Sequence, residues 1–159
     1  RDDQPLFEDF YANEFNDARA ICGFTPAAAQ TVRRLKARGY RVALATNPIF
    51  PHVATEHRIR WAGLTPEDFE IYTTYETSTF CKPNTDYYRE VARLLGAVPE
   101  ECLMVGNDAN EDMAARAPGM DVFLLTDCLI NTKNRDISVY PHGDFAALNA
   151  YLDRLNSEK

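Results

Sequence analysis

The strongest constraint on the fold is an alternation of short, nearly continuous apolar runs with longer segments of helical periodicity. The apolar runs have the length of strands, and their lack of polar alternation is typical of strands covered on both faces. Strands that alternate with helices in this order predict an α/β fold, with a doubly wound parallel sheet between layers of helices. The predicted strands are Tyr40–Ala45, Glu70–Thr74, Glu101–Val105 and Asp121–Leu125.

Capping residues and glycines mark where the predicted helices begin and end. Thr25 followed by Pro26 is typical of an N-cap and a first helical position, and Gly39 is placed to end that helix. Asp144 is expected to cap the last helix, which runs to about Leu155. The other segments predicted to be helical are Leu6–Ile21, Pro51–Ala62, Thr65–Asp68, Thr85–Leu95 and Asn110–Ala117.

Composition limits the partners and the compartment. A chain of 159 residues is long enough for one core and too short for two ordinary domains. The net charge of −7 argues against nonspecific binding to nucleic acid or to an anionic membrane, and the basic cluster Arg33–Arg38 is interpreted as a complement to a helix dipole. No apolar run approaches the ~20 residues of a membrane span. The widely spaced cysteines, without a Cys-x-x-Cys pair, favour a reducing, cytoplasmic location.

Polar residues follow several predicted strands, at the edge where parallel sheets bind ligands. Thr46 and Asn47 come directly after one strand, and Lys82 opens a helix after a loop. Asp108 follows another strand, and Asp112 lies four residues further on. Because ligands of open α/β sheets bind at the carboxyl ends of the strands, these five residues are the candidate site.

Each candidate residue has both a chemical and a purely structural interpretation. The Thr46 hydroxyl and nearby backbone N–H groups could bind a phosphate oxygen, or Thr46 and Asn47 could serve only as cap or turn residues. Lys82 could neutralise phosphate charge, or could be a solvated loop residue. Asp108 and Asp112 offer the carboxylate oxygens that Mg²⁺ prefers, or could only cap a helix and complement its dipole. Taken singly, none of these residues decides between the two interpretations.

Taken together, their order resembles that of a known family. Thr46-Asn47-Pro48, Lys82-Pro83 and the stretch Val105–Met113 resemble the second, third and fourth motifs of the haloacid dehalogenase-like hydrolases, which are mostly Mg-dependent phosphatases. The resemblance covers Gly23 to Leu155, and Val105–Met113 is its most specific part. Receiver domains of two-component signalling use similar residues, but there the acidic residues precede the threonine and the lysine.

The resemblance implies a phosphotransfer site and its cofactor. In this family an aspartate of the first motif attacks phosphorus and forms an aspartyl-phosphate, while a second aspartate acts as general acid and base. Thr46 and Lys82 would be catalytic residues that hold the transferring phosphoryl group, with Asn47 also binding phosphate. Asp108 would bind Mg²⁺ directly, and Asp112 directly or through water. The implied substrate is a small phosphomonoester.

The first motif, Asp-x-Asp, does not occur among these residues. In this family it follows the central strand, which lies between the strands of the second and fourth motifs. We therefore expect a fold that lacks its first, central strand, and a chain that is inactive alone although the full-length protein is an enzyme. Either a separate N-terminal fragment of the same protein associates with it, or the sheet closes differently. A central strand left out would cost many buried hydrogen bonds, each ~1–3 kcal/mol.

Residues 1–22 are interpreted as the end of a helical cap and residues 23–159 as the incomplete core. In members with a helical cap, the cap is inserted before the strand of the second motif, and Leu6–Ile21 would be its last helix. The aromatic stripe of this segment is then the packing face of the cap.

A phosphomutase, and a non-catalytic binding or scaffold module, remain alternatives to a phosphatase. A dehalogenase needs no metal, so the paired aspartates argue against it.

Overall fold

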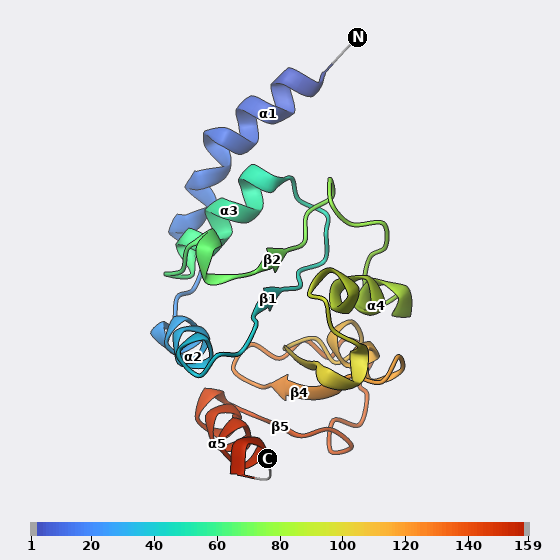
Figure 1. Ribbon diagram of the computed structural model, residues 1–159. Helices are drawn as coiled ribbons and strands as arrows, with labels where there is room; N and C mark the ends of the chain where they lie inside the picture. The colour runs from blue at the N-terminus through green and yellow to red at the C-terminus, as the bar shows by residue number, and fades with distance from the viewer. Residues whose placement is uncertain (1–2, 158–159) are drawn as a thin grey trace. The chain divides into compact units, whose positions relative to one another are not determined.

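The computed structural model describes residues 3–157. Residues 1–2 of the predicted cap segment and residues 158–159 of the predicted core segment lie outside the described residues. The chain forms two compact units, Arg1–Ser78 and Thr79–Lys159, called here the first and the second unit. The boundary between the two units, after Ser78, falls within residues 23–159, the segment interpreted from the sequence as the core. Figure 1 labels the α-helices and the strands except β3, and the short 3₁₀ helices are denoted η in the text.

The first unit contains helices and one pair of short strands. β1 and β2 pair in parallel, with Ala43 opposite Ile71 and Leu44 opposite Tyr72 (Figure 1). Its core is formed by Ala29, Ile59 and Leu64 with partly buried neighbours. The elements in chain order are α1 Gln4–Ala12, η1 Glu14–Ile21, α2 Pro26–Ala37, β1 Ala43–Leu44, α3 His52–Trp61, η2 Pro66–Asp68 and β2 Ile71–Tyr72.

The second unit is built on a three-stranded parallel sheet in the order β3-β4-β5. Leu103 lies opposite Asp121 and Gly106 opposite Leu124, and β4 continues into its pairing with β5. The last helix, α5, lies beside β5 and packs on β4 and β5 (Figure 1). The elements are α4 Thr85–Leu94, η3 Pro99–Glu101, β3 Leu103–Gly106, η4 Asp112–Arg116, β4 Asp121–Leu125, β5 His142–Gly143 and α5 Phe145–Ser157.

The predicted α/β class and the parallel pairing are confirmed, and β4 has the predicted bounds, but the other three predicted strands are shorter than expected and the strands form two sheets. β1 covers two of the six residues predicted for that strand, and β2 two of the five. Among residues 3–157, no strand pair joins β1 to β3, so each has one edge without a paired strand. The two-residue strand β5 was not predicted, because a polar loop precedes it and the pattern His142-Gly143 carries no apolar signal.

The predicted helix ends are confirmed at several positions. The Thr25 hydroxyl accepts a hydrogen bond from the Ala27 N–H, and Pro26 is the first residue of α2. Gly39 follows the end of α2 with φ +81°, a conformation that a glycine adopts without strain. Asp144 accepts from the Ala147 N–H at the start of α5. These boundaries follow from local capping chemistry, which a sequence displays directly.

Two predicted helices differ from the structure. The segment Leu6–Ile21 is not one helix: α1 ends at Ala12 and a 3₁₀ helix follows. The side-chain amide of Asn13 donates to the carbonyl oxygen of Asp9, and that of Asn16 donates to the carbonyl oxygen of Ala12, so polar side chains compete with the helical ladder there. The segment Asn110–Ala117 begins later and is the 3₁₀ helix η4, because the Asp108 carboxylate binds the N–H groups of the turn before it.

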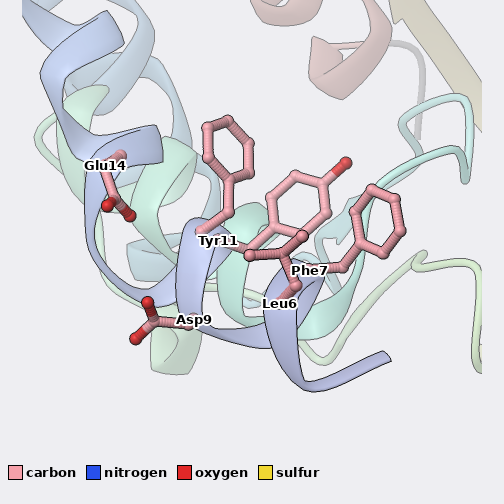
Figure 2. Close-up of a pocket in the computed structure, with 6 residues that line it drawn as sticks. Leu6, Phe7, Asp9, Tyr11 and Glu14 are labelled. Carbon is pink, nitrogen blue, oxygen red and sulfur yellow. The ribbon is translucent and has the colours of Figure 1, made fainter. Parts of the chain in front are cut away.

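The aromatic stripe of α1 and η1 is only partly covered. Phe15 packs on Trp61 and Phe50, whereas Phe7 and Phe10 are exposed. A pocket of about 490 Å³ lies along α1 and the start of η1 (Figure 2). None of the candidate site residues lines it, and its walls are mostly apolar: Leu6, Phe7, Asp9, Phe10, Tyr11 and Glu14. Within residues 3–157, none of the helices combines the length and the apolar character required to span a membrane.

Candidate active site

The centre of the candidate site is a buried ion pair between Lys82 and Asp112. The two side chains come from segments thirty residues apart, and Lys82 Nζ lies 2.6 Å from Asp112 Oδ1. Lys82 is 8% exposed and Asp112 is 6% exposed. A buried charge is tolerated when it is paired and hydrogen-bonded, so each residue accounts for the burial of the other. The purely structural interpretation of Lys82, a solvated loop residue, is therefore wrong.

The second oxygen of Asp112 holds the loop that follows β3. Asp112 Oδ2 accepts a hydrogen bond of 2.9 Å from the backbone N–H of Asp108. The carboxylate stands directly against Gly106, where a Cβ would lie only 2.1 Å from Asp112 Oδ2. Glycine is therefore required at position 106 for the carboxylate to reach both Lys82 and the loop.

Asp108 lies at the end of β3 with its carboxylate oriented by the backbone. Its Oδ1 accepts hydrogen bonds from the N–H groups of Asn110, at 2.7 Å, and Glu111, at 2.9 Å. The side chain is half-buried. This arrangement combines the cap that the structural interpretation expected with a carboxylate held in one position.

The donor set at this loop suits a magnesium ion better than a transition metal. Mg²⁺ is commonly held by one or two protein carboxylates, with water and phosphate oxygens completing its coordination. Asp108 and Asp112 supply two carboxylates within five residues of chain. In the part of the chain that the structure describes, no group of three His, Cys, Asp or Glu side chains is placed to hold a metal. The residues present therefore fit Mg²⁺ with a largely non-protein coordination shell.

Further contacts fix the loop, and sequence reasoning missed all of them. The Tyr88 hydroxyl of α4 donates a short hydrogen bond to the Glu111 carbonyl. Burial raises the pKa of Tyr88, and the nearby Asp112 charge raises it further, so the hydroxyl is a neutral donor. Arg135 Nε donates to Asn110 Oδ1 at 2.6 Å. The only sequence signal for Tyr88 was its place on the helix that follows Lys82.

Thr46 and Asn47 belong to the first unit, whereas Lys82, Asp108 and Asp112 belong to the second. Thr46 is half-buried beyond the end of β1, and its hydroxyl contacts the carbonyl oxygen of Thr73 at 3.3 Å. Thr73 in turn donates its hydroxyl to the Thr46 carbonyl at 2.9 Å. These contacts tie the end of β1 to the end of β2. The structure thus brings together three of the five candidate residues.

A comparison with known families tests the resemblance that the motifs indicate. A family model described as "Hydrolase: haloacid dehalogenase-like hydrolase" matches residues 6–118, more than half of the chain. The chain belongs to the haloacid dehalogenase-like hydrolases. The resemblance inferred from the motifs is confirmed at the level of the family.

Curated relatives are phosphatases and are longer proteins. Glyceraldehyde 3-phosphate phosphatase of Methanothermobacter thermautotrophicus is 33% identical over 101 residues, which are 63% of this chain and 43% of that protein. Pyrophosphatase PpaX of Bacillus cereus is 31% identical over 90 residues, 57% of this chain and 40% of that protein. The chain therefore spans less than half the length of these relatives.

Solved structures of the same fold cover most of the chain. CbbY from Rhodobacter sphaeroides, in complex with phosphate, has a TM-score of 0.70 at 21% identity and is matched by 91% of this chain over 65% of its own length. A predicted phosphoglycolate phosphatase from Haemophilus somnus has a TM-score of 0.70 at 23% identity, with 93% and 64% covered. At this level of identity the likeness shows the fold alone, and it agrees with the predicted α/β class.

Proposed function

We propose that the protein containing this chain is a magnesium-dependent phosphohydrolase that acts on a small phosphomonoester. The observation that carries the proposal is the buried Lys82–Asp112 pair beside the oriented Asp108 carboxylate. A lysine and two aspartates could be held together for stability alone, but a buried ion pair is a poor source of stability. Membership of the family and relatives named as a phosphatase and a pyrophosphatase give independent support.

Lys82 is proposed to bind the transferring phosphoryl group. An ammonium group has three N–H donors, so the bond to Asp112 leaves capacity for phosphoryl oxygens. Because Asp112 holds the ammonium in place, little reorganisation is needed as charge develops on the phosphoryl oxygens. Thr46 and Asn47 are assigned the same phosphate-binding role from the sequence motif.

Asp108 is proposed to hold the magnesium ion directly. Mg²⁺, when bound, would neutralise phosphate charge and polarise the phosphoryl group for attack. Asp112 is assigned a contact through water, because its two oxygens already accept hydrogen bonds from Lys82 and from the Asp108 N–H. The backbone bonds to Asp108 Oδ1 keep that carboxylate in one orientation.

The nucleophile is proposed to come from a segment outside residues 1–159. No Asp-x-Asp pair occurs in this sequence. β1 and β3, each within its own unit, keep one edge that no strand among residues 3–157 occupies, and such an edge offers backbone groups with which a strand carrying Asp-x-Asp could pair. On this proposal the aspartate attacks phosphorus, the P–O bond to the alcohol of the substrate breaks, and the second aspartate of the motif protonates the leaving oxygen. Water then hydrolyses the aspartyl-phosphate to phosphate and free aspartate, so the chain alone has no turnover.

The test compares two aspartate variants in the longest protein that contains this chain, using an aryl phosphate as substrate. Asp108→Asn should lower Mg-dependent phosphate release by at least about a hundredfold, the usual scale for one electrostatic group at the reacting centre. Asp121→Asn is the matched control, because Asp121 is exposed at the opposite end of β4. Equal activity of Asp108→Asn and the control, or turnover without any divalent metal, would contradict the proposal.

A further inference from the structure

The buried Tyr88 hydroxyl, like the Lys82 ammonium, reaches the loop that carries Asp108 and Asp112, but it binds the backbone of that loop rather than a side chain. Tyr88 is 1% exposed and its hydroxyl donates to the backbone carbonyl of Glu111. The N–H of the same residue donates to Asp108 Oδ1. One residue of the loop is thus bound on one side by Tyr88 and on the other by the candidate metal ligand.

Tyr88 and Lys82 act on adjacent residues of that loop. Lys82 binds the side chain of Asp112, and Tyr88 binds the carbonyl of Glu111. Both come from a single stretch, since Lys82 lies three residues before α4 and Tyr88 lies in its first turns. Tyr87 stiffens the arrangement, since its ring contacts Tyr88 edge-on with 5.2 Å between centroids. The stretch from Lys82 to Tyr88 therefore holds the loop at two points.

We infer that Tyr88 is a positioning residue: its hydroxyl holds the loop 106–112 in the shape that presents the Asp108 carboxylate to a divalent cation. The Lys82 contact alone fixes only the Asp112 side chain. The Glu111 carbonyl belongs to the peptide that joins Glu111 to Asp112, and the N–H of that same peptide donates to the Asp108 carbonyl oxygen at 2.9 Å. By holding this peptide, the Tyr88 hydroxyl opposes a movement of Glu111 that would withdraw its own N–H from Asp108 Oδ1. The cation part of this inference rests on the proposed function, whereas the loop part does not.

The test removes one oxygen atom with Tyr88→Phe and follows backbone amide exchange in the full chain. The amides of Asp108, Asn110, Glu111 and Asp112 are all hydrogen-bonded within the loop and report its shape. Tyr88→Phe should speed their exchange about three- to tenfold, the scale of one lost hydrogen bond, and leave β4 unchanged. Tyr72→Phe is the matched control, because Tyr72 also loses a hydroxyl bonded at 3.0 Å to a protein oxygen, that of Glu56, but lies in the first unit.

A second readout measures Mn²⁺ binding by electron paramagnetic resonance, with no substrate present. Tyr88→Phe should weaken Mn²⁺ binding about three- to tenfold, and Tyr72→Phe should not. Unchanged exchange of the loop amides in Tyr88→Phe, or faster exchange everywhere including β4, would overturn the inference. Faster loop exchange with unchanged Mn²⁺ affinity would overturn its cation part. A wild-type chain that binds no Mn²⁺ would count against the proposed metal site, while amide exchange would still decide the role of Tyr88.

Discussion

The Lys82–Asp112 ion pair is favourable only while both partners are present. Each charge is almost fully withdrawn from water and compensated by the other at 2.6 Å. Removing one partner leaves an uncompensated buried charge, which costs about 3–5 kcal/mol, whereas replacing both with uncharged groups is often neutral. The pair is therefore more easily explained by a need for a positioned ammonium than by stability.

Single and double substitutions of this pair should not be additive. Lys82→Met should lower the free energy of unfolding of the second unit by about 3 kcal/mol, because the Asp112 carboxylate stays buried. Asp112→Asn should cost a comparable amount. The double variant should be more stable than the sum of the two losses predicts, as urea unfolding of all four proteins would reveal. Strictly additive losses would mean that the two charges do not interact.

Gly106→Ala should displace the Asp112 carboxylate. The added Cβ would lie 2.1 Å from Asp112 Oδ2, closer than any van der Waals contact, so either the carboxylate or β3 must move. We expect a loss of about 1–3 kcal/mol in unfolding free energy and weaker Mn²⁺ binding. Gly23→Ala is the control, since nothing lies within 4 Å of its Cβ position, and it should change stability by less than about 0.5 kcal/mol. Equal stability of the two variants would contradict the close approach.

At the scale of single elements, η2 is stabilised by a carboxylate that closes its own turn. Asp68 Oδ2 accepts from the Thr65 N–H at 2.9 Å, and Lys36 lies 3.5 Å from Oδ1. The Thr65 hydrogen bond has the largest effect on the pKa of Asp68 and lowers it; burial opposes this by raising the pKa, and the nearby Lys36 charge lowers it again, so that the net pKa is lowered. The basic end of α2 therefore does more than complement a helix dipole: it is bonded to η2.

The Asp68 contribution should disappear in acid. Because its folded-state pKa is depressed, the stabilisation is present above the unfolded value of about 3.9 and is lost as the pH falls through the lower, folded value. Asp68→Asn should therefore be less stable than wild type at pH 7, by about 0.5–1 kcal/mol, and the difference should shrink below about pH 4. Urea unfolding at several pH values measures it. A stability difference between Asp68→Asn and wild type that does not change with pH would rule out the Asp68 carboxylate charge as its source.

The sequence predicts a structural feature correctly where residues close in the chain determine it, and fails where distant residues determine it. The caps at Thr25 and Asp144 and the terminator Gly39 are each settled within a few residues, and the structure has them as predicted. The break after Ala12 was missed because a periodic aromatic stripe continues through it. Tyr88 was missed because its partner is twenty-three residues away, and nothing local marks a helical tyrosine as bonded to a distant loop.

At the scale of the whole molecule, the strands form two parallel sheets rather than one. The sequence predicts the strand directions correctly, but sheet continuity depends on long-range pairing that local patterns do not encode. β1 and β3 each have an edge that is not paired with another strand among residues 3–157. Unpaired strand edges are liable to aggregation, so the chain alone should self-associate more readily than a longer protein whose further strands pair with them. Light scattering at matched concentrations measures this, and equal scattering would contradict it.

The most direct test of the proposed function is phosphate release from small phosphomonoesters, with residues 1–159 assayed beside the longest protein that contains them. We expect Mg-dependent release by the longer protein and none by residues 1–159. Release by residues 1–159 at the rate of the longer protein would contradict an external nucleophile. No release by either protein, over a panel that includes an aryl phosphate and short-chain sugar phosphates, would contradict a phosphohydrolase.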